Sequence, residues 1–289
     1  MSFEIIDIGK HFGTMNVSSV SINNLNNADK FHLYTKFGKL ADVDSDLTVE
    51  MKRSIFDRHR REMARCYGLD AKKIFVAEQK KKNGSSFILT RDFVEATTDG
   101  WDVEIPEDIL IISDKIPGVV AGHPVADCPV IMAMDMERGV AAVAHCGAEL
   151  IDKKMPMMLI DALQRTCNSR ENDIFTYISA CAGSDWTYDT YPSWATDRKL
   201  WDEAIREVNG VFQINMREVI LKQLQERGIS FVDFNMDNTR TSPEYYSNSM
   251  ASNSMASVNG GNDPKKAGRG FAGAYFKPKV KTLVLEKTR

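Results

Sequence analysis

The stretch of sequence from residue 122 to residue 147 reads GHPVADCPVIMAMDMERGVAAVAHCG. It contains two of the five histidines of the chain, His123 and His145, and two of its five cysteines, Cys128 and Cys146. Cysteine sulfur and histidine nitrogen are common zinc ligands, and a catalytic zinc site has three protein ligands and one open position. If these side chains meet in the folded chain, they could bind zinc and support its chemistry.

Two short apolar runs in this stretch flank the charged segment 136–139, which ends in glycine. This pattern predicts an antiparallel hairpin in which the glycine supplies the left-handed turn residue. A register that places His145 opposite Val130 puts Cys128 two residues along on the same face of the hairpin. Such neighbours are roughly 7–8 Å apart at the backbone, so both side chains can reach one ion. A register shift of one residue would place them on opposite faces.

Each of these residues also has a structural interpretation. A free cysteine is often buried as a small hydrophobic side chain, and a histidine at the end of an apolar strand is often a hydrogen-bonded core residue. His123 precedes a proline, so strand alternation does not fix its direction; it is either a third ligand or a surface or core histidine. Cys146 should point away from Cys128 if the strand continues; a bulge would turn it in and make it the next candidate for the third ligand. Asp127 could orient a ligand, act as a general base, or serve as a turn residue.

Length and charge narrow the class of protein. The 289 residues suffice for one large domain or two small ones. The net charge of −3 argues against a general nucleic-acid-binding protein, which needs a basic face. The locally basic cluster at residues 58–61 lies in a helical pattern, and a solvated helix face is the preferred interpretation, ahead of a phosphate contact.

Localisation is also constrained by the sequence. No apolar run reaches the length of a membrane span, and the N-terminal residues lack the core of a signal peptide. The five cysteines are odd in number and scattered, which favours a reducing compartment over a disulfide scaffold. We therefore expect a cytoplasmic protein that does not act at a membrane. The sequence leaves its oligomeric state open.

The elements that must position these residues alternate along the chain. Hydrophobic periodicity predicts an α/β or α+β fold with mixed β-sheets and flanking helices. Strands are predicted in residues 1–30, 31–38, 74–79, 87–90, 108–114, the two arms of the hairpin, 174–184, 229–236 and 280–286, and helices at about 47–67, 152–166, 196–208 and 215–227. The Ser/Asn/Gly-rich segment 247–266 cannot bury a core, so we predict a flexible loop there, with a mobile lid as the sharper alternative.

Several motifs resemble the laccase-domain family, also called YfiH-like or polyphenol-oxidase-type. Residues 126–131 (ADCPVI) resemble the family's ADC-P motif, and residues 145–149 (HCGAE) resemble its HaGWRG motif. Further similar motifs follow the family order at 108–118, 178–183, 238–239, 245–247 and 267–269. The resemblance covers nearly the entire chain and implies the laccase-domain fold, with residues 1–289 forming a single domain.

The resemblance also implies a function. Family members bind zinc through the histidine of a Q-V-H-G motif, the cysteine of ADC and the first histidine of HaGWRG, and they act on purine nucleosides. It thus implies zinc-dependent phosphorolysis or deamination of adenosine- or inosine-type substrates, with Asp127, Cys128 and His145 as catalytic residues. Cys128 and His145 would bind zinc, and Arg269 and Lys81 would contact nucleoside or phosphate. One cysteine and one or two histidines are too few for a multicopper cluster.

The sequence departs from the family pattern at specific positions. Residues 79–82 read QKKK, so the Q-V-H-G histidine has no counterpart, and lysine is a poor zinc ligand because it must first lose a proton. Glu149 replaces an arginine, and residues 249–250 replace two more, which weakens contacts to an anionic co-substrate. Two hypotheses follow. One is a zinc enzyme of reduced activity in which His123 restores the third ligand; the other is a binding or scaffold protein that has lost the metal site.

Overall fold

The computed structural model describes residues 3–4, 12–17, 60–61, 64–65, 68–242, 245, 247–251 and 270–277. Its strands are β1 (Phe3–Glu4), β2 (Phe12–Val17), β3 (Ile74–Val76), β4 (Ser86–Ile88), β5 (Ile109–Ser113), β6 (Val120–Val125), β7 (Val130–Asp135), β8 (Val140–His145), β9 (Ile174–Ile178), β10 (Thr187–Tyr188), β11 (Ile205–Val208), β12 (Val211–Ile214), β13 (Phe231–Phe234) and β14 (Gly270–Phe276). Its helices are α3 (Arg91–Ala96), α4 (Ala148–Asp152), α5 (Met155–Cys167), α6 (Arg198–Trp201), α7 (Met216–Glu226) and α8 (Asn248–Ala251), with short 3-10 turns η2 (Ala71–Lys73) and η3 (Glu171–Asp173).

The predicted hairpin is the centre of a six-stranded mixed sheet of order β13-β9-β7-β8-β5-β4. Strands β7 and β8 pair antiparallel with Asp135 opposite Val140 and Val130 opposite His145. Gly139 in the connecting turn has φ +61°, a conformation that glycine adopts without steric cost. The predicted register is therefore confirmed.

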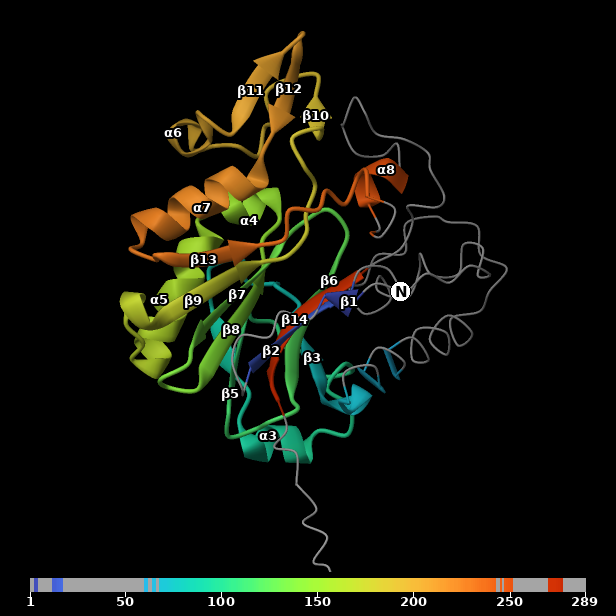
Figure 1. Cartoon of the computed structure of the whole chain (residues 1–289), viewed down its shortest axis with the longest axis vertical. Helices are drawn as coiled ribbons and strands as arrows, with labels where there is room; N and C mark the ends of the chain where they lie inside the picture. Colours follow the sequence, from blue (N-terminus) through green and yellow to red (C-terminus); the bar gives the residue numbers. More distant parts are fainter. Residues whose placement is uncertain are drawn as a thin grey trace, which may run out of the picture.

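Both faces of this sheet are buried, and alternate residues face different layers. In β8, Ala142 and Ala144 pack in the cluster formed with helices α5 and α7. Ala141 and Val143 pack in the cluster shared with the second sheet. Figure 1 shows α5 and α7 on one side of the β7–β9 region and strands β6 and β14 on another. Because side chains alternate along a strand, each residue of the hairpin is assigned to the helix layer or to the space between the sheets.

The second sheet has the order β1-β2-β14-β6-β3. Strand β6 pairs antiparallel with β14 and parallel with β3, so that His123 lies opposite Ala272. Ala121 of β6 and Ala272 of β14 both belong to the cluster between the two sheets. Residues 121, 123 and 125 share one side of β6 by strand alternation. His123 therefore faces the six-stranded sheet.

The helix predicted at 196–208 is confirmed only for residues 198–201 and is wrong for residues 205–208. Helix α6 ends at Trp201, and residues 205–208 form β11, which pairs with β12 in a three-stranded sheet of order β10-β12-β11. The turn between them is Asn209-Gly210, with φ +52° and +79°. Asn-Gly between two short strands is a strong hairpin signal because both residues tolerate positive φ. This turn signal directly follows the predicted helix, and the hairpin that it forms takes the last four residues of the predicted helix as a strand.

The remaining predicted elements agree where the structure describes them. The helix expected at 152–166 is α5, preceded by the short α4, and the helix expected at 215–227 is α7. The predicted strands at 31–38 and 280–286 lie outside the described residues, as does most of the predicted helix 47–67. Mixed sheets with flanking helices confirm the predicted fold class.

The segment 247–266 differs at its start from the predicted loop. Residues 248–251 form α8, and the side chains of Ser247 and Ser249 are buried. These polar groups are buried because they have hydrogen-bond partners, not because they fill an apolar core. Residues 252–266 lie outside the described part, so the predicted flexibility stays a prediction.

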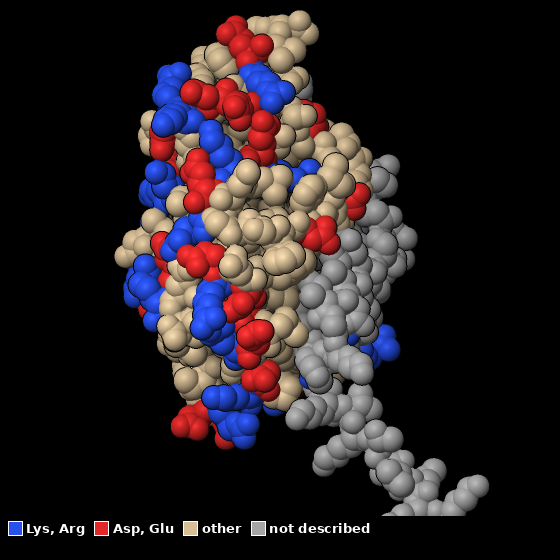
Figure 2. Space-filling view, turned by 60° about the vertical axis from the view of Figure 1, so that its left-hand side comes forward, with Lys and Arg blue, Asp and Glu red and all other residues tan. Residues whose placement is uncertain are grey.

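The surface gives two further observations. On the face shown in Figure 2, acidic and basic side chains are interspersed and neither sign gathers into one large patch. Among the described helices, none has the length and apolar character needed to cross a membrane.

Candidate functional site

Cys128 and His145 meet beside the backbone of Gly147. His145 shares its strand face with Val143, which faces the space between the sheets. A Cβ atom added to Gly147 would lie 3.3 Å from His145 Cε1 and 3.5 Å from Cys128 Sγ. The thiol and the imidazole thus converge on one point, as the hairpin register predicts. A glycine at position 147 leaves the room that both side chains use.

Gln79 holds the imidazole of His145 in a fixed orientation. The side-chain amide of Gln79 donates to the backbone oxygen of His145 at 2.8 Å, and its carbonyl oxygen lies 2.8 Å from His145 Nδ1. Since the amide nitrogen already faces a carbonyl acceptor, the oxygen faces the ring, and Nδ1 must carry the proton. The Nε2 atom then carries the lone pair, which is the tautomer a metal-binding histidine needs.

His123 is the third donor of this region. Its side chain is buried, its Nε2 atom has no hydrogen-bond partner, and its ring centroid is 6.1 Å from that of His145. Burial lowers the pKa of His123 well below its ordinary value, and the adjacent His145 lowers it further. The ring is therefore neutral at pH 7. Buried polar atoms usually have a hydrogen-bond partner, so Nε2 of His123 is a candidate donor that no other group of the described chain engages.

The chemistry of these three donors fits zinc, which binds thiolate and neutral imidazole. The three donors lie farther apart than ligands that surround one bound ion. Within the described ranges, no three His, Cys, Asp or Glu side chains lie close enough together to hold one ion. Cys128 and His145 already lie together at Gly147, whereas the ring centroid of His123 is 6.1 Å from that of His145.

Cys146 does not belong to this group. It lies in the cluster formed with α5, on the helix side of the sheet, and its thiol contacts the backbone oxygen of Ala144. Burial raises the pKa of Cys146 well above its ordinary value, and the nearby Cys128 raises it further. The prediction that Cys146 points away from Cys128 is confirmed, and strand alternation is the reason.

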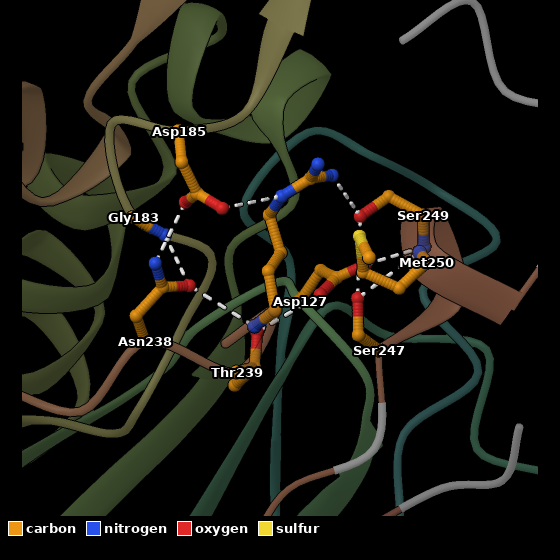
Figure 3. A network of polar contacts seen from close by, with 9 residues as sticks. Asp127, Gly183, Asp185, Asn238, Thr239, Ser247, Ser249 and Met250 are labelled. Carbon is orange, nitrogen blue, oxygen red and sulfur yellow. Dashed lines mark hydrogen bonds and ion pairs between the residues drawn. The ribbon is translucent and has the colours of Figure 1, made fainter. Parts of the chain in front are cut away.

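Asp127, the residue before Cys128, belongs to a buried polar network (Figure 3). Its carboxylate accepts hydrogen bonds from the Thr239 hydroxyl at 2.8 Å and from the Ser249 backbone amide at 2.7 Å. Asn238 and Arg240 extend the network to Asp185, at 2.7 and 3.0 Å respectively. Residues distant in sequence therefore converge on Asp127, which directly precedes the candidate ligand Cys128.

The sequence of residues 38–256 matches the family model described as multi-copper polyphenol oxidoreductase laccase. The chain belongs to this family. The structure is similar to YlmD from Geobacillus stearothermophilus, with a TM-score of 0.66 and 16% identity over 92% of each chain. It is also similar to YfiH from Bacillus licheniformis, with a TM-score of 0.61 and 16% identity over 92% of this chain and 91% of that chain. These likenesses confirm the laccase-domain fold. No curated protein matches the sequence significantly.

Three positions where this laccase-domain protein departs from the family motifs, Lys81, Lys82 and Glu149, form exposed ion pairs that we call the rim of the site. The ammonium of Lys81 lies 2.7 Å from a Glu107 carboxylate oxygen, and that of Lys82 lies 3.0 Å from Glu149. Glu149 also pairs with Lys153 at 2.9 Å. The pKa of Glu149 is lowered by its hydrogen bonds from Lys153 and Lys82. Each lysine is thus engaged by a carboxylate of the same chain.

Other expected site residues fall in different places. Arg269, expected from the resemblance to contact substrate, lies outside the described residues. Ser249, one of the two residues that replace the family arginines, bonds through its hydroxyl to the buried guanidinium of Arg240 at 2.6 Å. A guanidinium thus lies beside position 249 although position 249 itself lost its cation.

Three residues that lie around the candidate site were not identified from the sequence: Gln79, Arg240 and Tyr188. The hydrogen bonds of Gln79 to His145 could have been suspected from its place at the head of the QKKK motif. Arg240 directly follows the Asn238-Thr239 motif, which was a usable signal. Nothing in the sequence pointed to Tyr188. In the structure, burial raises the pKa of its phenol, a hydrogen bond with Trp194 lowers it, and the nearby Cys128 raises it again. Only the fold brings β10 near the thiol.

Proposed function

We propose that this protein is a zinc-dependent enzyme that acts on purine nucleosides by phosphorolysis or deamination. The observation that carries the proposal is the pair of hydrogen bonds between Gln79 and His145: the Gln79 amide donates to the His145 backbone oxygen, and His145 Nδ1–H donates to the Gln79 carbonyl oxygen. They fix the Nδ1–H tautomer, so that Nε2 carries the lone pair beside the thiol of Cys128. A histidine with only a packing role does not need this orientation, whereas a metal ligand does.

The residues have distinct roles in this proposal. Cys128 and His145 would hold the zinc ion, and His123 would supply the third ligand in place of the histidine missing from residues 79–82. A bound zinc ion supplies a Lewis acid that lowers the pKa of water and stabilises negative charge on oxygen. His123 is already neutral and already lacks a hydrogen-bond partner. Binding a metal through Nε2 would therefore break no hydrogen bond at that atom.

The rim suggests which co-substrate is favoured. A phosphate anion would have to compete with Glu107 for Lys81 and with Glu149 for Lys82. Charge-assisted contacts of this kind dominate phosphate binding. We therefore expect phosphorolysis to be slow, and any deamination, which needs only water, to be less affected. Arg269 and Lys81 stay proposed contacts to substrate.

The proposal is tested by zinc content and turnover. Purified wild type is assayed with adenosine and inosine, with added zinc, and with and without phosphate. We expect one zinc per chain, lost in Cys128→Ala and weakened in His123→Ala. Cys167→Ala is the matched control, because Cys167 is also a partly exposed free thiol but lies at the C-terminal end of α5. Turnover that survives Cys128→Ala unchanged would reject the zinc mechanism.

One observation favours the alternative of a non-catalytic binding or scaffold protein. In the described part of the chain, no closed group of three ligating side chains is present. That alternative predicts no zinc above the level of Cys128→Ala, and no nucleoside turnover in either buffer. Stoichiometric zinc that survives His123→Ala would instead place the third ligand elsewhere in the chain.

A further inference from the structure

We infer that Asp127 is a positioning residue that fastens the segment 247–251 to the loop of Cys128 and thereby holds the thiol in place. Its importance for zinc rests on the proposed function. The contact itself does not, and it can be measured in zinc-free protein without any substrate.

Three segments distant in sequence meet at Asp127. The backbone oxygen of Asp127 accepts from the Ala182 amide at 2.8 Å. One carboxylate oxygen accepts from the Thr239 hydroxyl and the other from the Ser249 amide, at 2.8 and 2.7 Å. Asp127 is 5% exposed, and both of its carboxylate oxygens are already engaged. Hydrogen bonds to a buried charged acceptor are among the stronger ones in proteins.

The backbone of Asp127 is held in an uncommon conformation. Its φ is +84°, which non-glycine residues rarely adopt and which persists only where the surroundings impose it. The next residue is Cys128, and the strand β7 begins at Val130. The bonds that fix Asp127 therefore set the direction in which the chain enters Cys128. Loosening them should release the thiol without disturbing the hairpin.

A second contact fastens the same segment. The guanidinium of Arg240 bonds to the Ser249 hydroxyl on one side and to Asp185 on the other. Figure 3 shows Asp127, Ser247 and Ser249 facing one another across this network. The Ser249 amide and the Ser249 hydroxyl thus have different partners. Different substitutions of Ser249 can therefore remove its contact to Arg240 alone or its contacts to both Arg240 and Asp127.

This arrangement argues against Asp127 as a general base. A base must present an available oxygen to the proton that it removes. In Asp127 both oxygens accept from groups of the protein itself, the Thr239 hydroxyl and the Ser249 backbone amide. The two roles make opposite predictions for Asp127→Asn. The amide can still accept from the Ser249 N–H and donate to the Thr239 hydroxyl, but it cannot act as a base.

The test is the rate at which iodoacetamide alkylates Cys128, followed by peptide mass spectrometry with Cys167 as the internal reference. Asp127→Gly removes the carboxylate and tolerates positive φ, so it should raise the Cys128 rate about 10-fold to 100-fold, the effect expected from lost charge-assisted bonds. Asp127→Asn should stay within about 3-fold of wild type, because neutral bonds replace charged ones. Hydrogen exchange of the Ser249 amide should follow the same order.

A second pair of variants tests the contact from the other end. Ser249→Pro removes the amide hydrogen that Asp127 accepts, in the first turn of α8 where proline is tolerated. Ser249→Ala removes only the hydroxyl. We expect Ser249→Pro to raise Cys128 alkylation about 10-fold or more above Ser249→Ala. This pair decides the question even if Asp127→Gly fails to fold.

Two outcomes would overturn the inference. One is a Cys128 rate that stays within about 2-fold of wild type in both Asp127→Gly and Ser249→Pro. The other is an Asp127→Asn protein with unchanged alkylation and exchange but no turnover, which would make Asp127 a base. Absence of zinc or turnover in the wild type would reject the proposed function. The alkylation rate of Cys128 and the exchange rate of the Ser249 amide would still test the contact of Asp127.

Discussion

The interior and the rim of the candidate site use polar residues in opposite ways. In the interior, Gln79 bonds to His145, and the buried carboxylate of Asp108 accepts from the backbone amides of residues 82, 83 and 84. At the rim, Lys81 forms an ion pair with Glu107, and Lys82 forms one with Glu149. The two lysine side chains are 44% and 47% exposed. The interior contacts fix geometry, because buried groups must be satisfied. The rim contacts only neutralise charge, because water screens them.

The comparison is tested most strongly at Asp108. Asp108→Ala leaves three backbone amides of the 82–84 turn without their acceptor; the Gly84 bond is fully buried and the other two are partly buried, and a buried unsatisfied donor costs about 1–3 kcal/mol. We expect the free energy of unfolding to fall by about 3 kcal/mol or more, measured by urea denaturation. Asp92→Ala, an exposed aspartate in the first turn of α3, is the control and should cost less than about 1 kcal/mol. An equal loss of unfolding free energy in the two variants would contradict the role of Asp108 as the acceptor that holds the 82–84 turn.

The next largest effect is expected at Gln79. Gln79→Leu removes both bonds to His145 and releases its tautomer, so zinc affinity should fall about 10-fold to 100-fold, as for other partners of metal ligands. Competition with a zinc chelator measures it. Gln79→Glu keeps the acceptor for Nδ1–H and should lose less. If the leucine variant binds zinc as tightly as wild type, Gln79 has no role in orienting the ligand.

A smaller effect is expected at Glu149, with a defined pH dependence. Lys153 and then Lys82 lower the pKa of Glu149 in the folded protein below the ordinary 4.5. A carboxyl with a lowered folded pKa contributes stability above its unfolded pKa and loses it as the pH falls through the folded value. The melting temperature of wild type should therefore exceed that of Glu149→Gln near pH 7 and converge with it in acid. The corresponding difference in the free energy of unfolding should stay below about 1 kcal/mol, since the side chain is half exposed. A gap that widens in acid would be inconsistent with the ion pair.

The smallest effect is expected at Lys81. Its ion pair with Glu107 is exposed on the lysine side, so Lys81→Ala should change the free energy of unfolding by less than about 1 kcal/mol. It should also leave zinc affinity unchanged, because Lys81 has taken no ligand role. Chelator competition on the same preparations as Gln79→Leu provides the comparison. A 10-fold loss of zinc affinity in Lys81→Ala would show that the rim, and not only the interior, supports the metal.

Sequence reasoning succeeded where the determining contacts are local. The register of the β7–β8 hairpin follows from a turn glycine and two apolar runs within 20 residues, and it placed Cys128 and His145 together. The same logic placed Cys146 on the other face. It failed at 205–208, where helical spacing was followed although the Asn-Gly turn signal at 209–210 comes directly afterwards. Both outcomes depended on information that neighbouring residues contain.

The site beyond the hairpin depended on long-range contacts. Gln79 reaches His145 across 66 residues of sequence, and Asp127 reaches Ser249 across 122. His123 faces His145 only because β6 packs between β3 and β14, with its inward side toward the other sheet. No periodicity within one segment encodes such a pairing, since strand alternation fixes the face of a residue and not the partner that it meets.

The sequence by itself determined the two donors of the hairpin, their common face and the family whose motifs surround them. Turn chemistry and period-two alternation act over a few residues and leave little choice of register. The tertiary structure decided which groups surround those donors: a glutamine that sets the tautomer of His145, a neutral buried histidine opposite it, and an aspartate bound by two distant segments. These contacts form only when two sheets pack together, because burial is what makes each unpaired polar atom costly and each correct partner necessary.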